Sequence, residues 1–377
     1  MRFFDHNATT PLLPEAKAVW LNVSEEHWHN PSSPYRAGAA AHARLEAARE
    51  RLAGMLAVDP RRIVFNSGAT EGNNAVFAAW ARALPKDGRV GVGATEHPSV
   101  LEAAKHFLDG RIDWLAPDCG GTIRPEAVEI GGLAAVSLMA ANNETGILNP
   151  WREWAAACRE RGIPMHCDAS QWIGKMPLEG LGACDYLTAC AHKFGGPKGV
   201  GFLLVPEGFS AELFGGAQEQ GRRAGTENLA GILSMLTALE WTASRRSAGA
   251  ESGKKKFLEG LKERIPGVGI VGEGGPALWN TASIIMPEFK SVRWIRTLER
   301  KGFLVSAGSA CSTGKDGPSH VLAAMGIDAG KAERTLRISS GWQTSAADWE
   351  ALLDALAAGY RELKNGRAGS NSQVISI

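Results

Sequence analysis

The sequence carries almost no net charge and contains no long apolar run. Its 377 residues include 41 Lys and Arg against 40 Asp and Glu, which gives no electrostatic case for binding nucleic acid or an anionic membrane surface. No stretch approaches the roughly 20 apolar residues of a membrane span, and the first residues, "MRFFDHNATTPLLPEA", lack the apolar core of a secretory signal. We therefore expect a cytoplasmic protein.

Cysteine is scarce and shows no metal-binding or redox spacing. None of the six cysteines forms a C-x-x-C pair, and the chain is large, so we expect reduced thiols. The two histidines of "HWH" (His27 to His29) have no further ligands nearby in sequence and make a poor metal site. We expect no metal.

Short apolar runs alternate with helix-patterned segments along the first two thirds of the chain. This alternation predicts an α/β fold with a mostly parallel sheet, and the length predicts a second domain. Residues 43–56 are expected as an amphipathic helix, and "GVGFLLV" as a strand that returns after a tight turn. Composition changes near "SRRSAGAESGKKKFLEG". The expected parts are an N-terminal arm (1–14), a large domain (15–250), a smaller α+β domain (251–364) and a flexible tail (365–377).

Polar residues follow the predicted strands. In open parallel sheets ligands bind at the carboxyl ends of strands. After "RIVF", the residues Asn66 to Glu71 open a helix, whose N-terminus suits a phosphate unless Ser67 or Thr70 only caps it. His97 follows "RVGVGA" and either serves a planar ligand or has a structural role. Asn142 and Asn143 follow "AAVSLMA", where a turn is the simpler interpretation.

Asp168 and Lys193 follow two further predicted strands. A buried aspartate needs a cationic partner, either an arginine or the protonated ring nitrogen of a cofactor. A lysine at the end of an apolar run could be a surface residue, an anion binder or an amine kept for covalent chemistry. The spacing G-x-x-x-x-G-K-[ST] is absent around Lys193, which argues against a nucleotide-binding loop. Together these residues are the parts of a pyridoxal 5'-phosphate site, including a Schiff-base amine and an aspartate.

A series of motifs stands in one order along the chain. They are "FDHNATTPLLPEA", "NPSS", "FNSGATEGNN", "TEHPSV", "NNETG", "CDASQWIGK", "AHKFGGPKGVG", "RRAGTEN", "SAGSACS" and "LRISSG". With these motifs the chain resembles the cysteine desulfurases of the class V aminotransferase group, of the nitrogenase/iron–sulfur type. This resemblance implies the type I pyridoxal-phosphate-dependent transferase fold and a homodimer with shared active sites. The balanced charge predicts no direct contact with nucleic acid or membrane.

The resemblance also implies residue roles. Lys193 would hold the cofactor covalently, Asp168 would pair with its ring nitrogen, Gln171 would reach its phenolic oxygen and His97 would stack on its ring. Asn143 and Arg337 would hold the substrate carboxylate, which suits a guanidinium. The further cofactor-binding residues implied are Ala69, Thr70, His192, Asn143 and, from the partner subunit, Thr226.

Cys311 is the residue that would separate a desulfurase from other enzymes of this fold. Its surroundings, "SAGSACSTGKDGPSH", are rich in glycine and serine and predict an exposed loop. The expected reaction converts L-cysteine to L-alanine with Lys193, Cys311 and His97 as catalytic groups. The sulfur would remain as a persulfide on Cys311, for transfer to an acceptor in iron–sulfur assembly or another sulfur pathway. Lys315 could favour the thiolate.

Two positions depart from the family pattern. Cys190 stands where the family commonly has a serine that binds the phosphate, and a thiol is a weak donor. Tyr35 stands where a histidine is usual. The alternatives are a selenocysteine lyase, an aminotransferase, a racemase, or a non-catalytic scaffold of the same fold. The Cys311 loop argues against the aminotransferase and the racemase, and the full set of site residues argues against the scaffold.

Overall fold

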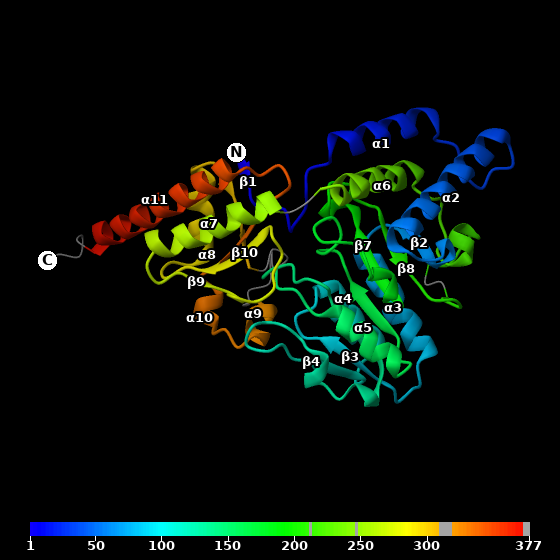
Figure 1. Cartoon of the computed structure of the whole chain (residues 1–377), viewed down its shortest axis with the longest axis horizontal. Coiled ribbons are helices and arrows are strands. Elements are labelled where there is room, and N and C mark those ends of the chain that lie inside the picture. Colours follow the sequence, from blue (N-terminus) through cyan, green and yellow to red (C-terminus); the bar gives the residue numbers. More distant parts are fainter. Residues whose placement is uncertain (211–212, 246–247, 309–318, 372–377) are drawn as a thin grey trace. The chain divides into compact units, whose positions relative to one another are not determined.

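The computed structural model describes residues 1–210, 213–245, 248–308 and 319–371, which fold into two compact units (Figure 1). The large unit comprises Thr9–Asn142 and Leu148–Arg245. The small unit comprises Met1–Ala8, Asn143–Ile147 and Arg246–Ile377. Each is described by itself below.

A seven-stranded sheet forms the centre of the large unit. Strand β8 runs antiparallel to both of its neighbours, and all other neighbouring strands are parallel. Strands β2 to β7 therefore all point the same way, and their carboxyl ends lie along one edge. In sheet order the strands are β2 (Ile63–Asn66), β8 (Gly201–Leu204), β7 (Tyr186–Cys190), β6 (Met165–Asp168), β5 (Leu133–Ser137), β3 (Arg89–Gly93) and β4 (Ile112–Leu115).

Helices cover this sheet because its strands are apolar on both sides. Every residue of β2, β6, β7 and β8 is buried, as expected for strands packed on two faces. Helix α3 presents Val76, Phe77 and Trp80 to a core shared with strand β3 and helix α4. The helices of this unit are α1 (Pro14–Glu26), α2 (Arg36–Leu56), α3 (Ala69–Ala83), α4 (Pro98–Phe107), α5 (Trp151–Glu160) and α6 (Leu229–Ala243).

The small unit is built on an antiparallel sheet in the order β12 (Ser306–Ala307), β13 (Thr335–Ser339), β10 (Thr281–Ile285) and β9 (Gly269–Ile270). A separate parallel pair joins β1 (Arg2–Phe3) to β11 (Phe303–Leu304). Phe4, Trp294 and Trp349 are central to its apolar core. In Figure 1 the long helix α11 lies beside α7. The helices are α7 (Ala248–Arg264), α8 (Ser291–Arg300), α9 (His320–Ala324), α10 (Ala329–Ala332) and α11 (Ala346–Asn371).

The structure confirms the predicted α/β class with its mostly parallel sheet, and the antiparallel return at "GVGFLLV" is strand β8. The helix expected at 43–56 is the later part of α2, which begins at Arg36. The contacts group the first eight residues and Asn143–Ile147 with the C-terminal part of the chain. Helix α11 reaches Asn371, past the boundary expected at residue 364. Among the described residues, no helix is long and apolar enough to span a membrane.

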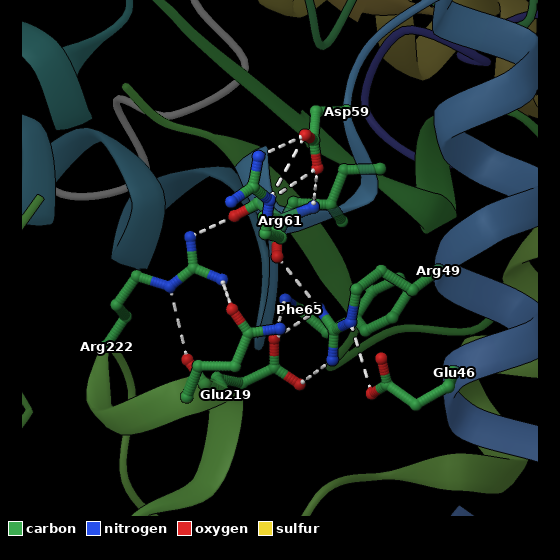
Figure 2. A network of polar contacts seen from close by, with 9 residues as sticks. Glu46, Arg49, Asp59, Arg61, Phe65, Glu219 and Arg222 are labelled. Carbon is green, nitrogen blue, oxygen red and sulfur yellow. Dashed lines mark hydrogen bonds and ion pairs between the residues drawn. The ribbon is translucent and has the colours of Figure 1, made fainter. Parts of the chain in front are cut away.

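A buried ion pair connects three segments of the large unit (Figure 2). Arg49 of α2 binds both carboxylate oxygens of Glu219 at 2.8 and 3.0 Å, with side chains only 2% and 1% exposed. Glu219 also accepts a hydrogen bond from the Phe65 N–H at 2.9 Å, and Arg49 donates to the Ile63 carbonyl at 2.8 Å. Helix α2, strand β2 and the short turn η6 (Gln218–Gly221) are thereby tied together.

The ion pair holds the turn in an unusual backbone conformation. Glu219 and Gln220 have φ angles of 49° and 58°, in the left-handed region that non-glycine residues rarely adopt. Burial alone would lower the pKa of Arg49, but hydrogen bonds and charges from Glu219 and Glu46 outweigh burial and raise it. Arg49 is therefore a fixed cation, and the turn depends on it.

We predict that Glu219→Gln destabilises the protein strongly. The substitution leaves Arg49 buried without its counter-charge, which typically costs about 3–5 kcal/mol. Glu240→Gln is the matched control, because Glu240 pairs with Arg51 at 2.7 Å but both side chains are more than 40% exposed. Such an exposed pair contributes about 0–1 kcal/mol. Urea unfolding of the two variants measures the difference, and equal losses would contradict the assigned role of the buried pair.

Candidate functional site

The carboxyl edge of the large sheet gathers most of the residues predicted for the site. Asp168 ends β6, Lys193 follows β7 in a short 3-10 turn, and His97 caps α4 just after β3. Helix α3 begins after β2, at Gly68 and Ala69. The strands are parallel, so side chains that are far apart in sequence meet at this edge.

Asp168 is the buried anion of the site and is only 5% exposed. One of its carboxylate oxygens accepts the Ser170 N–H at 2.9 Å, and the other accepts the Asn73 side-chain amide at 3.0 Å. Asn73 also donates to the Ser99 hydroxyl at 2.9 Å, which lies 2.8 Å from Nδ1 of His97. A continuous chain of hydrogen bonds therefore links His97 to Asp168.

A second set of polar contacts extends from Asn73 beneath the site. The Thr188 hydroxyl donates to Oδ1 of Asn73 at 2.7 Å and lies 3.3 Å from Nε2 of His166. Nδ1 of His166 lies 2.9 Å from the Ser137 hydroxyl. Burial lowers the pKa of His166 to about 4, although the charge of Asp168 acts in the opposite direction. His166 is thus a neutral, hydrogen-bonded part of the framework.

Glu96 is a second buried carboxyl group near the site and is fully shielded from solvent. Burial, and then the charge of Asp168, raise the pKa of Glu96 well above its ordinary value, although a hydrogen bond from the Met139 N–H acts against this shift. Burial and the neighbouring charge thus favour the neutral form of Glu96.

His192 and Lys193 lie in the turn that follows β7. Burial, and then the charges of Lys193, Lys198 and Lys175, lower the pKa of His192 to about 4. Its Nδ1 lies 3.1 Å from the Thr9 hydroxyl. His192 is consequently a neutral group that can donate one N–H, placed beside several lysines. Gln171 is also buried, and its side-chain oxygen accepts the Lys175 ammonium at 2.6 Å.

The N-terminus of α3 has no side-chain cap among the described residues. Its N-cap is Gly68, with φ 144°, and Ala69 and Thr70 start the helix with N–H groups directed out of its end. Cys190 lies next to this end, since a Cβ on Gly68 would be 3.7 Å from the Cβ of Cys190. Burial raises the pKa of the Cys190 thiol, although hydrogen bonds to its sulfur from Ser170 and from the Ala69 N–H act in the opposite direction.

Thr226 lies on the exposed loop between η6 and α6. The neighbouring Arg223 binds Glu71 of α3 at 2.8 Å, and Glu71 accepts the Ser67 N–H at 2.9 Å. A cavity of about 110 Å³ is lined by Ser67, Thr226 and nearby residues. The loop therefore lies against the start of α3, held there by Arg223 and by the buried Arg49–Glu219 pair.

Arg337 is placed in the small unit, on strand β13, and is 1% exposed. Its guanidinium binds Asp5 at 2.7 Å and donates to the Asn143 carbonyl at 3.2 Å. Its buried Nε has no hydrogen-bond partner among the described residues. Asn7 also donates to the Asn143 carbonyl, at 3.2 Å. The structure thus places Arg337 beside Asn143, and their roles toward a substrate stay predictions.

Glu144, next to Asn143, lies beside Gly308 and Ser319. The Ser319 hydroxyl donates to its carboxyl at 2.5 Å, and a Cβ on Gly308 would be 3.6 Å from the same oxygen. Burial raises the pKa of Glu144 to about 7, although Ser319 and the charge of Arg337 act against this shift. Glu144 therefore titrates near neutral pH.

Cys311 and Lys315 lie outside the described residues, and their roles stay predictions. The five described cysteines are all free thiols, as expected. Tyr35, at the second departure from the family pattern, is an exposed N-cap of α2. Among the residues the structure covers, no cluster of His, Cys, Asp and Glu could hold a metal ion.

Comparisons with known proteins confirm the predicted resemblance. The family model described as aminotransferase class-V matches residues 2–352. The chain belongs to this family. A cysteine desulfurase from Sinorhizobium fredii is 35% identical over 97% of this chain and 98% of its own length. An IscS-like cysteine desulfurase from Mycobacterium tuberculosis is 33% identical over 94% of this chain and 95% of its own length. A solved NifS-like protein superposes with a TM-score of 0.84 at 31% identity, covering 95% of this chain and 99% of its own.

Several residues that surround the candidate site at the carboxyl edge of the large sheet were not predicted from the sequence. They are the supporting side chains Asn73, Ser99, Thr188, Glu96 and Lys175, which hold other groups in place. Asn73 and Lys175 stand within the quoted motifs "FNSGATEGNN" and "CDASQWIGK", and each is a polar residue that the structure buries. That contrast between polarity and burial is the signal that could have identified them.

We predict that Glu144 makes stability fall as pH rises. Its pKa is raised in the folded chain, so the stability from the protonated form is complete below about pH 4.5 and is lost as pH rises toward about 7. The full change is on the order of 3 kcal/mol. Urea unfolding at pH 5 and pH 8 should show a smaller loss for Glu144→Gln than for wild type. Glu299→Gln, an exposed change on α8, should behave like wild type, and an equal loss in all three would contradict the assignment.

Proposed function

We propose that the chain is a cysteine desulfurase that converts L-cysteine to L-alanine and keeps the sulfur as a persulfide on Cys311. The observation that carries the proposal is the carboxyl edge of the large sheet. There Asp168, His97, His192 and Lys193 lie beside the open N-terminus of α3. Relatives at 33% and 35% identity over nearly the whole chain, both cysteine desulfurases, support the same activity.

The donors at this edge fit pyridoxal 5'-phosphate. The N-terminus of α3, where Gly68 supplies no side-chain cap, offers N–H groups and a positive dipole end to the phosphate. Neutral His192 adds a donor at this edge, and Cys190 lies beside the helix end. At the other end, the buried anion Asp168 fits a protonated ring nitrogen, which would supply the cationic partner that such a carboxylate needs. The set is thus complementary to a ligand with an anionic and a cationic end.

The bound cofactor would supply an electron sink for the electron pair left when a proton leaves the substrate α-carbon. Lys193 would hold the cofactor and would accept that proton at Nζ. Lys193 is partly buried, in the turn that follows β7. His97 is oriented through Ser99, whose N–H donates to Nδ1 at 3.1 Å, so the neutral ring carries its proton on Nε2.

Sulfur transfer requires a thiolate at Cys311. Its Sγ attacks the substrate sulfur, an S–S bond forms, and the bond between the substrate Cβ and sulfur breaks. The electron pair of that bond stays with the carbon fragment, which takes up a proton and leaves as L-alanine. The two thiols thus become one persulfide and one C–H bond, and no external oxidant is needed.

Arg337 is proposed to bind the substrate carboxylate, with Asn143 beside it. Arginine binds carboxylates through two parallel N–H donors. The Nε–H of Arg337 is a buried donor with no partner among the described residues, which leaves it available to a ligand. Asp5 binds Nη2 of the same guanidinium at 2.7 Å and helps to fix its plane.

The oligomeric state and the partner protein are also proposals. We propose a homodimer in which Thr226 of one subunit completes the phosphate site of the other, since its loop is exposed yet firmly anchored. A sulfur-acceptor protein would take the persulfide sulfur from Cys311. The cytoplasmic location and the division at residues 14, 250 and 364 stay predictions.

The decisive test of the proposed function is Cys311→Ser. This variant should bind pyridoxal phosphate as wild type does but should lose at least about a hundredfold in alanine formation from cysteine, because the nucleophile is gone. Cys119→Ser changes an exposed thiol and should leave the rate intact. Full activity without Cys311 would refute the desulfurase mechanism. Activity only with selenocysteine would indicate a selenocysteine lyase.

Cys190→Ser should strengthen the binding of the phosphate. A hydroxyl is a better donor than a thiol, and one improved hydrogen bond is worth about 1 kcal/mol, or roughly a fivefold lower Kd for pyridoxal phosphate. The measurement is titration of the apoprotein by absorbance. Pyridoxal, which lacks the phosphate, is the matched control and should bind both proteins equally. An unchanged Kd for pyridoxal phosphate would show that Cys190 does not face the phosphate.

A further inference from the structure

Lys175 is a buried lysine next to the proposed cofactor site that the mechanism above does not use. It lies in the turn after β6 and is 7% exposed, and Gln171 at the start of that turn is 3% exposed. Its Nζ donates to Oε1 of Gln171 at 2.6 Å. Lysine is rarely buried to this degree, so its contact with Gln171 requires an explanation.

The contact fixes the orientation of the Gln171 amide. An ammonium group has three donors and no acceptor, so only the amide oxygen can face it. Turning the amide over would bring its NH₂ group against the ammonium and leave two sets of donors facing each other in a buried site. Hydrogen bonds from charged donors are also stronger than neutral ones. The NH₂ group of Gln171 therefore points away from Lys175.

The pair lies close to the other groups of the site. Gln171 follows Asp168 in the same turn, and the Ser170 N–H between them binds the Asp168 carboxylate. The charge of Lys175 is also among the causes that lower the pKa of His192, the neighbour of Lys193. Lys175 thus acts at the edge where the cofactor would bind.

We propose that Lys175 is a positioning residue for Gln171: it holds the amide oxygen so that the NH₂ group is directed at the phenolic oxygen of the cofactor. The inference rests on the proposed function. A donor at this oxygen stabilises its deprotonated form and lowers the pH midpoint at which the bound cofactor changes its visible absorbance. Loss of the correct amide orientation should raise that midpoint.

The test is a double-mutant cycle read by the pH midpoint of the visible absorbance of the holoenzyme. Lys175→Met should raise the midpoint by about one unit, a tenfold change in the protonation equilibrium. In a Gln171→Ala background the same change should have little further effect, because Lys175 acts through Gln171. Lys175→Arg, which keeps charge and donors, should restore most of the wild-type midpoint.

Lys198→Met is the matched control for charge alone. Lys198 is exposed, and its charge also lowers the pKa of His192, yet it belongs to a different segment from Gln171. Its removal should shift the midpoint by less than half as much as Lys175→Met. An equal shift in both lysine variants, or an undiminished Lys175 effect without Gln171, would overturn the positioning role.

A second variant keeps the proposal testable if Lys175→Met does not fold. Gln171→Glu retains a partner for Lys175 but removes the amide N–H, so it should fold, bind the cofactor and show a raised midpoint. An unchanged midpoint would overturn the inference. Wild-type protein that acquires no visible absorbance with pyridoxal phosphate would instead contradict the proposed function, and the inference with it. A bound cofactor insensitive to Lys175 contradicts the positioning role only.

Discussion

The arrangement of the site depends on one buried carboxylate, Asp168. Charge in a buried position is unfavourable unless hydrogen bonds or opposite charge compensate it. Here the Ser170 N–H and the Asn73 amide bind the two oxygens, and Asn73 is itself held by Thr188 and Ser99. These side chains are arranged to stabilise one carboxylate at the end of strand β6, whose residues are all buried.

Burial favours the neutral forms of the titratable groups beside Asp168. Burial, and then the charge of Asp168, raise the pKa of Glu96 and favour its protonated form. His166 is uncharged because burial lowers its pKa to about 4. Asp168 is therefore the anion that a cationic ring nitrogen would meet at this edge, and the supporting groups contribute hydrogen bonds without adding competing charge. This division of roles explains why so many polar residues can be buried together.

The sequence predicted that the strand-end residues lie at one sheet edge, but it did not predict the supporting residues around them. Asp168, His97 and Lys193 follow apolar runs directly, so the rule that parallel strands end at one edge was sufficient to bring them together. Asn73 and Lys175 lie inside a helix and a turn, where only the three-dimensional packing determines which neighbours they meet. Strand β1 pairs with β11 from the other end of the chain, and no local pattern indicates such a contact.

The Arg49–Glu219 pair could not be predicted for the same reason. Its partners come from a helix and a distant turn, and the turn contains two residues with positive φ that have no glycine signal in the sequence. The cluster of Asp5, Asn143 and Arg337 likewise joins three segments of the small unit. Hydrophobic periodicity determines which elements form, whereas buried ion pairs depend on tertiary neighbours that periodicity does not encode.

The lysines around His192 show how such long-range placement serves chemistry. Lys175 and Lys193 come from different turns, and with burial and Lys198 they keep His192 uncharged. A neutral histidine can donate a hydrogen bond to a phosphate without holding it as tightly as an imidazolium would. The positive charge is then carried by lysines, of which one can be neutral for covalent chemistry and another can hold an amide. Different groups at one sheet edge therefore supply donors, charge and a reactive amine.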